Sequence, residues 1–300
     1  MIPIDVISGF LGAGKTTFIS LLLEYYIKKG ERPVYIVNEF GNTGLDAKLL
    51  ENEGFQAIEM ANGCICCTLK DSVVDTIREV LQRFSPTRIL FEPSGIFVFD
   101  NFLELVRTQT LQYCCRIGSV ITVVDSLNFN PSKLKYGNFL YNQIKSASAI
   151  VVSKLEKSPI SAEEIVCDIQ NINPQAFVFA KEWRDMTVRD LRAIVTHAAY
   201  DRKKTPASAK TLLHEKFQTL TLPLESELNP LQVDRLIARI QSGNLGDLCR
   251  VKGILKVSGR YKLLNIAQQD VDLREYKGVA ETAITFIGKN LNRENIFTSL

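Results

Sequence analysis

Short apolar runs and longer amphipathic segments alternate along the first two thirds of the chain. Apolar runs typical of buried strands occupy residues 2–7, 33–37, 88–91, 119–124, 149–152 and 176–179. Between them, apolar residues at three- and four-residue steps predict helices over 16–29, 71–84, 97–108, 138–145, 162–171 and 188–197. This alternation predicts an α/β fold with a mainly parallel sheet and helices on both of its faces.

The pattern changes near residue 200, where the chain becomes polar and rich in small residues. Beyond this stretch, strands are predicted over 217–224, 250–257, 261–266 and 282–287, and helices over 230–241 and 292–300. Ser258-Gly259, between two of these strands, predicts a short hairpin turn. We therefore expect a first domain over 1–200, a linker over 201–214, and a small α+β domain over 215–300.

A glycine-rich turn separates the first predicted strand from the first predicted helix. Residues 9–17 read Gly-Phe-Leu-Gly-Ala-Gly-Lys-Thr-Thr and fit the phosphate-binding pattern G-x-x-x-x-G-K-[ST] in its required strand–turn–helix setting. Glycines let the backbone approach phosphates, and the start of a helix favours an anion. The nucleotide phosphates are expected to bind at Gly9, Gly12, Ala13, Gly14, Lys15, Thr16 and Thr17. Lys15 supplies positive charge there, and the Thr16 hydroxyl is a ligand for Mg²⁺.

A run of thiols follows an Asn-Gly turn at residues 62–67 and comprises Cys64, Cys66 and Cys67. The chain starts directly with a predicted strand and shows no signal-peptide pattern, so we expect a cytoplasmic protein with reduced thiols. Thiolates suit Zn²⁺ and softer ions, and three of them leave a tetrahedral site incomplete, as exchange of a metal would require. The alternative is that these cysteines are small buried residues in a turn.

Taken together, the glycine-rich turn and the thiol run resemble the CobW-type family of P-loop GTPases, relatives of the nickel-insertion GTPases of urease and hydrogenase maturation. Residues 37–41, with Asp46 after them, resemble its first switch region. Residues 89–95 resemble its Walker B strand, with Glu92 where most GTPases have Asp, and residues 62–67 match its N-G-C-x-C-C signature. The resemblance covers residues 1–195 strongly and continues more weakly through 250–253, which resemble its C-terminal domain.

This resemblance implies a GTPase that couples hydrolysis to the handling of a transition metal. Its catalytic residues would be Lys15, Glu92 and Gly95, with Glu92 acting on Mg²⁺ or on the attacking water and the Gly95 N–H reaching the γ-phosphate. Thr16, Asp46 and Glu92 would hold Mg²⁺. Zn²⁺ is the first metal expected at the thiols and Co²⁺ the second.

Glu39 follows an apolar strand and precedes a glycine-containing loop, and the resemblance places it close to the thiols and the Mg²⁺ site. It is therefore a candidate fourth ligand beside Cys64, Cys66 and Cys67, or a switch element. For both Glu39 and Asp46, an ordinary exposed acid stays an open alternative.

The chain departs from guanine-specific GTPases in one segment. These enzymes usually end a late strand with Asn-Lys-x-Asp, whereas this chain has Ser153-Lys154-Leu155-Glu156. Lys154 is retained, but Glu156 is one methylene longer than Asp and would need a shift to accept both guanine hydrogen bonds. Base binding is assigned to Ser153, Lys154 and Glu156, with GTP expected and ATP or relaxed specificity as the rival.

The net charge and the length of the apolar runs limit which partners can be expected. The net charge of +3 gives no reason to expect nucleic acid or an anionic membrane, and no apolar run is long enough to span a bilayer. A client metalloprotein, docked through the C-terminal domain, is the expected partner, and a homodimer is one option for the assembly. Two rival functions stay open: an NTPase switch whose cysteines are structural and which delivers no metal, and a small-molecule kinase.

Overall fold

The computed structural model describes residues 1–38, 45–60, 69–95, 99–108, 110–201, 217–268, 270–278 and 280–298. These residues form two compact units, of which the first holds the described residues up to 201 and the second those from 217 onward. The predicted linker over 201–214 falls almost wholly outside this description. Its boundaries with the two domains therefore stay predictions.

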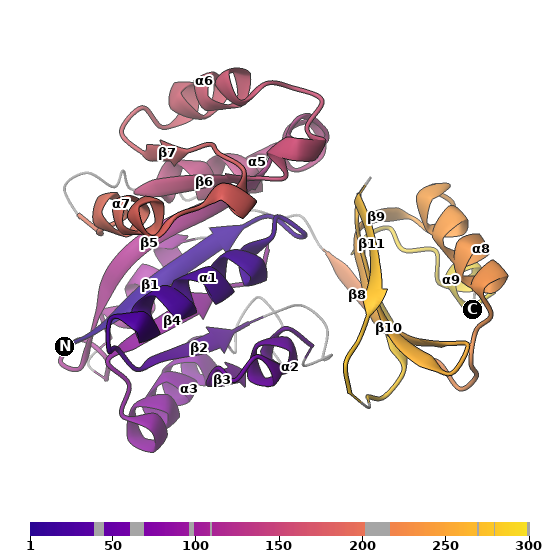
Figure 1. The fold of residues 1–300 in the computed structure, drawn as a ribbon, viewed down its shortest axis with the longest axis horizontal. Coiled ribbons are helices and arrows are strands. Elements are labelled where there is room, and N and C mark those ends of the chain that lie inside the picture. Colours follow the sequence, from indigo (N-terminus) through magenta and orange to yellow (C-terminus); the bar gives the residue numbers. More distant parts are fainter. Residues whose placement is uncertain are drawn as a thin grey trace. The chain divides into compact units, whose positions relative to one another are not determined.

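The first unit is built on a parallel sheet whose described strands follow the order β3-β2-β4-β1-β5-β6-β7 (Figure 1). The strands are β1 (Ile2–Gly9), β2 (Pro33–Val37), β3 (Ala57–Glu59), β4 (Arg88–Glu92), β5 (Cys115–Asp125), β6 (Ala149–Ser153) and β7 (Phe177–Phe179). The prediction of a parallel α/β sheet is confirmed. The chain runs to one side of β1 for β2 and to the other for β5, and ligands bind open α/β sheets at such switch points, outside the carboxyl ends of the strands.

Helices cover both faces of this sheet, as predicted. One face packs against α1 (Lys15–Lys28), α2 (Leu45–Asn52) and α7 (Val188–His197). The other face packs against α3 (Leu69–Phe84), α4 (Phe99–Val106), α5 (Phe129–Ser146) and α6 (Ala162–Ile172). Two short 3-10 helices, η1 (Leu155–Lys157) and η2 (Trp183–Asp185), follow the carboxyl ends of β6 and β7. None of the described helices combines the length and apolarity needed to cross a membrane.

Helix α5 begins at Phe129, whereas the sequence pattern predicts a helix from residue 138. Pro131 and Gly137 interrupt the pattern, and both residue types have low helix propensity. The backbone leaves helical geometry at Tyr136 (φ −135°, ψ 27°), and the side chains of Phe129 and Tyr136 are buried. Tertiary packing of these two aromatic rings therefore extends the helix beyond what local propensity predicts.

The second unit contains an antiparallel sheet in the order β11-β10-β9-β12-β8. Its elements are β8 (Gln218–Pro223), α8 (Pro230–Gln241), β9 (Asp247–Val257), β10 (Arg260–Ala267), β11 (Asp270–Glu275), β12 (Ala283–Lys289) and α9 (Arg293–Phe297). Both helices pack on one face of this sheet (Figure 1), which confirms the predicted α+β arrangement. Strand β11, which the sequence pattern did not predict, forms one edge of it.

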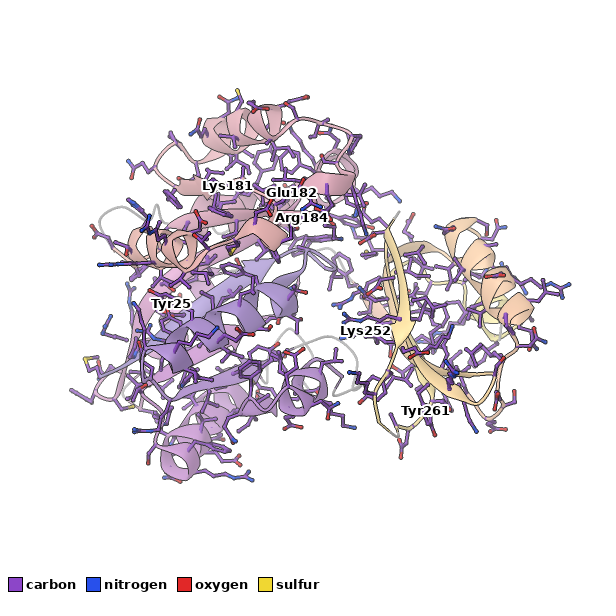
Figure 2. All side chains as sticks on the ribbon, viewed as in Figure 1. Tyr25, Lys181, Glu182, Arg184, Lys252 and Tyr261 are labelled. Carbon is purple, nitrogen blue, oxygen red and sulfur yellow. The ribbon has the colours of Figure 1, made fainter. Side chains whose placement is uncertain are left out.

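The turn between β9 and β10 is the predicted hairpin at Ser258 and Gly259. Both residues have positive φ angles, 49° and 77°, as a two-residue turn that follows the right-handed twist of the strands requires. Alternation along β9 sends Val251 into the core beneath the helices and Lys252 to the opposite face of the sheet (Figure 2).

Candidate functional site

The glycine-rich turn joins the end of β1 to the start of α1. Gly9 has a φ angle of +149°, and a Cβ atom there would lie 2.4 Å from the Val123 carbonyl oxygen, so the turn requires glycine at this place. Gly14 caps α1 in the left-handed conformation (φ 92°) and offers no side chain to the helix amides. The first turn of α1 carries no acidic residue. The amino end of the helix thus keeps its partial positive charge for an anion, and the turn fits nucleotide phosphates.

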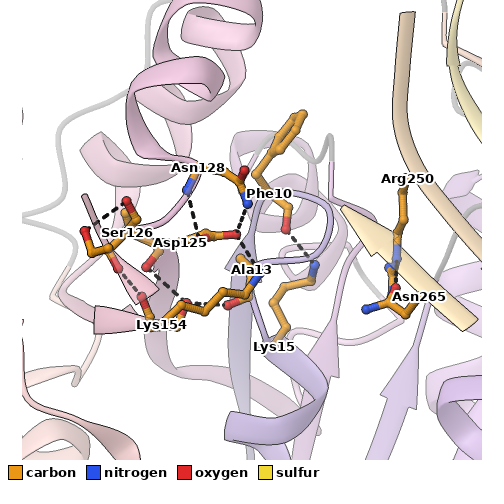
Figure 3. A network of polar contacts seen from close by, with 12 residues as sticks. Phe10, Ala13, Lys15, Asp125, Ser126, Asn128, Lys154, Arg250 and Asn265 are labelled. Atoms are coloured by element: carbon orange, nitrogen blue, oxygen red, sulfur yellow. Dashed lines mark hydrogen bonds and ion pairs between the residues drawn. The ribbon is translucent and has the colours of Figure 1, made fainter. Parts of the chain in front are cut away.

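Lys15 and Thr16, the two residues predicted to meet phosphate and Mg²⁺, both contact the Glu92 carboxylate. The Lys15 Nζ atom lies 3.6 Å from Glu92 Oε1. It also lies 3.3 Å from the Phe10 carbonyl oxygen (Figure 3). The Thr16 hydroxyl donates to Glu92 Oε2 over 3.4 Å. These groups meet because β4 pairs with β1, which places the carboxyl end of β4 beside the turn. Glu92 is 3% exposed and Lys15 is 4% exposed, so the ion pair is buried.

Tyr35 is a member of this site that sequence reasoning missed. Its hydroxyl donates a hydrogen bond of 2.6 Å to Glu92 Oε2. It lies on β2, which pairs with β4, and its side chain is fully buried. All five residues of β2 are buried, so the apolar pattern of the strand carries no signal that separates a core tyrosine from one that binds a carboxylate.

Gly95 also lies against the glycine-rich turn. A Cβ atom at Gly95 would come within 2.7 Å of the Leu11 backbone nitrogen, so the two backbone segments approach as closely as glycine permits. The Gly95 carbonyl oxygen accepts a hydrogen bond of 2.9 Å from the Gln143 side chain on α5. The structure therefore places Gly95 beside the turn and shows Gln143 as a group that holds it, while the predicted contact of the Gly95 N–H with the γ-phosphate stays a prediction.

The segment predicted to bind the base follows β6. The Ser153 hydroxyl donates to the Ala13 carbonyl oxygen over 2.7 Å and so ties the end of β6 to the phosphate-binding turn. Lys154 adopts a left-handed backbone (φ 58°), and its ammonium group lies 2.7 Å from Asp125 Oδ2. Glu156 lies in η1 and is exposed. Ser153 and Lys154 are thus placed beside the turn, while Glu156 is open to solvent.

Asp125 and Trp183 complete this end of the sheet. Asp125, the last residue of β5, also accepts a hydrogen bond of 2.9 Å from the Asn128 amide (Figure 3). The Trp183 indole N–H donates to the Val152 carbonyl oxygen over 2.8 Å, and its ring lies 5.6 Å from that of Phe18. A Cβ atom at Gly14 would touch the same indole at 3.5 Å. Trp183 follows β7 in an irregular segment, where periodicity gives no indication of its role.

The predicted transition-metal ligands Glu39, Cys64, Cys66 and Cys67 lie outside the described residues. Asp46 falls within α2, with its side chain outside the description. Among the residues that are described, no group of three or more His, Cys, Asp or Glu side chains could hold a metal ion. The thiol site and the role of Asp46 therefore stay predictions.

The chain is similar to named proteins over different extents. It is 39% identical to the zinc chaperone CobW of Sinorhizobium sp over 132 residues, which are 42% of this chain and 37% of that protein. The chain thus spans little more than a third of that relative's length. It is 26% identical to the zinc-regulated GTPase metalloprotein activator 1 of Saccharomyces cerevisiae, over 98% of this chain and 82% of that protein.

Similarity of fold extends over the whole chain. The crystal structure of the Zn(II)-bound YjiA GTPase from E. coli superposes with a TM-score of 0.50 at 18% identity, covering 99% of this chain and 97% of that chain. At this identity the likeness is one of fold alone. Residues 217–300 match the cobalamin synthesis protein CobW C-terminal domain. Residues 3–180, more than half of the chain, match the CobW/HypB/UreG nucleotide-binding domain, and the chain therefore belongs to the CobW/HypB/UreG family.

Proposed function

We propose that this protein is a GTP-hydrolysing metal chaperone, in which the nucleotide state controls the binding of a transition metal. The single observation that carries the nucleotide part is the contact of Lys15 and Thr16 with the buried Glu92 carboxylate beside an uncapped helix start. A cation, a hydroxyl and a carboxylate at a phosphate-binding turn are the groups that phosphoryl transfer to water requires.

The residues of the turn fit Mg²⁺ as well as phosphate. Thr16 and Glu92 would hold the ion, with Asp46 as a further carboxylate, and Lys15 would neutralise phosphate charge. The bound ion would supply a Lewis acid that stabilises the negative charge developing on the phosphate oxygens. Glu92 would orient the attacking water, and Gly95 would offer its backbone N–H to the γ-phosphate. Catalysis would then rest on positioning and electrostatics.

GTP is the proposed nucleotide. Ser153 and Lys154 lie at the end of β6, where the family resemblance places base recognition, and exposed Glu156 can accept hydrogen bonds from a guanine. Steady-state phosphate release measured with GTP and with ATP tests this. A higher kcat/KM for GTP, reduced by Glu156→Ala, is expected, whereas equal values for the two nucleotides would contradict guanine specificity.

The metal part of the proposal rests on the sequence and on the names of the relatives. Cys64, Cys66 and Cys67, with Glu39, would hold the cargo. Zn²⁺ is proposed first because two similar proteins bear zinc in their names, and Co²⁺ second. Contacts to the γ-phosphate would order the switch segments and so change the thiol site, which lies between those segments in the sequence. A client metalloprotein that docks on the C-terminal domain would receive the metal.

Titration of Zn²⁺ and of Co²⁺ into the reduced protein tests the coupling, once with a non-hydrolysable GTP analogue and once with GDP. We expect one tight equivalent whose affinity differs between the two nucleotides and which is lost in Cys66→Ser. Cys167→Ser is the matched control, since this thiol is exposed and stands alone. Equal affinity in both nucleotide states would mean no coupling between the sites. If Cys66→Ser still bound the metal, the thiols would not be its ligands. The result would then favour the rival function, an NTPase switch with structural cysteines.

A further inference from the structure

Lys15, Thr16 and Tyr35 all contact the Glu92 carboxylate, but the proposed function gives them different roles in nucleotide binding. Lys15 and Thr16 approach it over 3.6 and 3.4 Å, which are long contacts. The Tyr35 hydroxyl approaches over 2.6 Å, the short distance typical of an O–H donor bound to a carboxylate. Under the proposed function, Lys15 is required by the phosphates and Thr16 by Mg²⁺. The proposed function assigns Tyr35 neither of these two roles.

The position of Tyr35 is held by the fold. Its residue is fully buried in the middle of β2, and β2 pairs through its whole length with β4, the strand that ends in Glu92. Tyr35 and Glu92 lie on the sheet face that α1 covers. Breaking a hydrogen bond between a buried hydroxyl and a buried carboxylate costs free energy, so the Tyr35 O–H is expected to keep the carboxylate oxygen that it contacts.

We propose that Tyr35 is a positioning residue for the reaction. It keeps one Glu92 oxygen in place when Lys15 turns to the phosphates and Thr16 to Mg²⁺, so that the other oxygen points at the ion or the attacking water. This inference rests on the proposed function, which supplies the ligands that release Lys15 and Thr16. In this arrangement Tyr35 would act through Glu92 and not on the nucleotide or the metal directly.

The test compares Tyr35→Phe with Tyr25→Phe. Tyr25 is a matched control because it is 4% exposed, lies on α1 (Figure 2), and its hydroxyl has no hydrogen-bond partner among the described residues. Two quantities are measured for each protein: steady-state hydrolysis of GTP, and the Mg²⁺ concentration at which binding of a fluorescent GDP analogue is half-maximal. Tyr35→Phe is expected to lower kcat by about tenfold, as loss of one hydrogen bond to a charged group implies, with little change in KM.

The Mg²⁺ midpoint is expected to rise in Tyr35→Phe, while both quantities stay within about twofold of wild type in Tyr25→Phe. A merely structural role of Tyr35 would lower the stability of Tyr35→Phe, without separating kcat from KM or moving the Mg²⁺ midpoint. Unchanged kcat and midpoint in Tyr35→Phe would overturn the inference, and so would equal losses in the two variants.

A second measurement needs neither nucleotide nor metal. The thermal unfolding midpoint is compared for wild type, Tyr35→Phe, Glu92→Ala and the double variant. If Tyr35 acts through Glu92, its loss lowers the midpoint by about 2–4 °C in wild type and by less in the Glu92→Ala background. Equal shifts in both backgrounds would overturn the contact. If wild type released no phosphate from GTP, the proposed function would fail, and the positioning role would fall with it even where this cycle shows coupling.

Discussion

Two buried carboxylates lie beneath opposite ends of α1, and their surroundings differ. Asp5 on β1 accepts from the Arg88 guanidinium over 2.8 Å and from the Tyr26 hydroxyl over 2.9 Å. Glu92 on β4 has a comparable short bond from Tyr35, but its cation, Lys15, is 3.6 Å away. The ion pair of Asp5 is therefore formed at hydrogen-bond distance, whereas that of Glu92 is loose.

The difference follows from the direction of the strands. Asp5 and Arg88 lie toward the amino ends of β1 and β4, where Tyr26 from the last part of α1 covers them. Glu92 ends β4 at the edge where the phosphate-binding turn begins. Asp5 and Arg88 can stay paired permanently, because they lie away from the edge where the phosphate-binding turn begins. Under the proposed function, Lys15 and Thr16 would have to leave Glu92 for the phosphates and Mg²⁺, and their long contacts with Glu92 agree with this. We infer that the distance between a buried carboxylate and its cation distinguishes a structural carboxylate, Asp5, from one that takes part in the reaction, Glu92.

Replacing each carboxylate by its amide is expected to have the largest effect. Glu92→Gln is expected to reduce kcat for GTP, per folded molecule, by about 10²–10⁴, the range that general acid–base groups contribute. Asp5→Asn is expected to lower the unfolding temperature and to leave kcat per folded molecule within about twofold. Steady-state hydrolysis and thermal unfolding of both variants measure this. A larger loss of kcat in Asp5→Asn than in Glu92→Gln would contradict it.

Removing the cation at Asp5 is expected to have the next largest effect. Arg88 also binds Glu31 over 2.8 Å and stacks 4.2 Å from the centre of the Tyr26 ring. Arg88→Met should cost about 3 kcal/mol of unfolding free energy, because it leaves the Asp5 charge buried without its partner. Urea unfolding measures the loss. Arg192→Met, at an exposed arginine on α7, is the control and should change the free energy by less than about 0.5 kcal/mol.

The pH dependence of stability tests the buried contact between Asp5 and Tyr26. Burial and, after it, the charge of Asp5 raise the pKa of Tyr26 above its ordinary value of 10.0. A raised pKa means that the folded state keeps the phenol proton where the unfolded state loses it, so this contribution is complete below about pH 10 and declines above it. Unfolding free energies between pH 8 and pH 11 should therefore fall less steeply in Tyr26→Phe than in wild type. Equal slopes would show that Tyr26 does not titrate with folding.

The smallest expected effect concerns thiol reactivity at the amino ends of the strands. Burial, and next the neighbouring Cys114, raise the pKa of Cys115 to about 12, and the residue is 1% exposed. Cys115 should therefore resist iodoacetamide near pH 8, whereas exposed Cys167 should react, because the thiolate is the nucleophile. Mass spectrometry of the labelled peptides distinguishes the two. Similar rates at both cysteines would contradict the burial argument, and labelling of the unfolded chain, where both should react, is the control.

Much of the fold and part of the site were predictable from the sequence. Strand β2 and helices α7 and α8 have the predicted bounds, since each combines a strong apolar pattern with clear ends. For α7 and α8, capping boxes formed by Thr187 and by Asn229 mark the starts. Strand β3 and helix α2 were not predicted, because a strand of three residues and a helix of eight are too short to show a period.

The sequence by itself determined the phosphate-binding turn, because glycine spacing and the strand–turn–helix order are local properties of the chain. It also determined the membership of the family and the candidate roles of Lys15, Thr16 and Glu92. Only the tertiary structure decided which residues surround Glu92 and Gly95. Tyr35 and Gln143 come from a neighbouring strand and from a helix on the far face of the sheet, and their sequence neighbourhoods are those of ordinary core residues. Such contacts depend on strand order and helix packing, which no local pattern encodes.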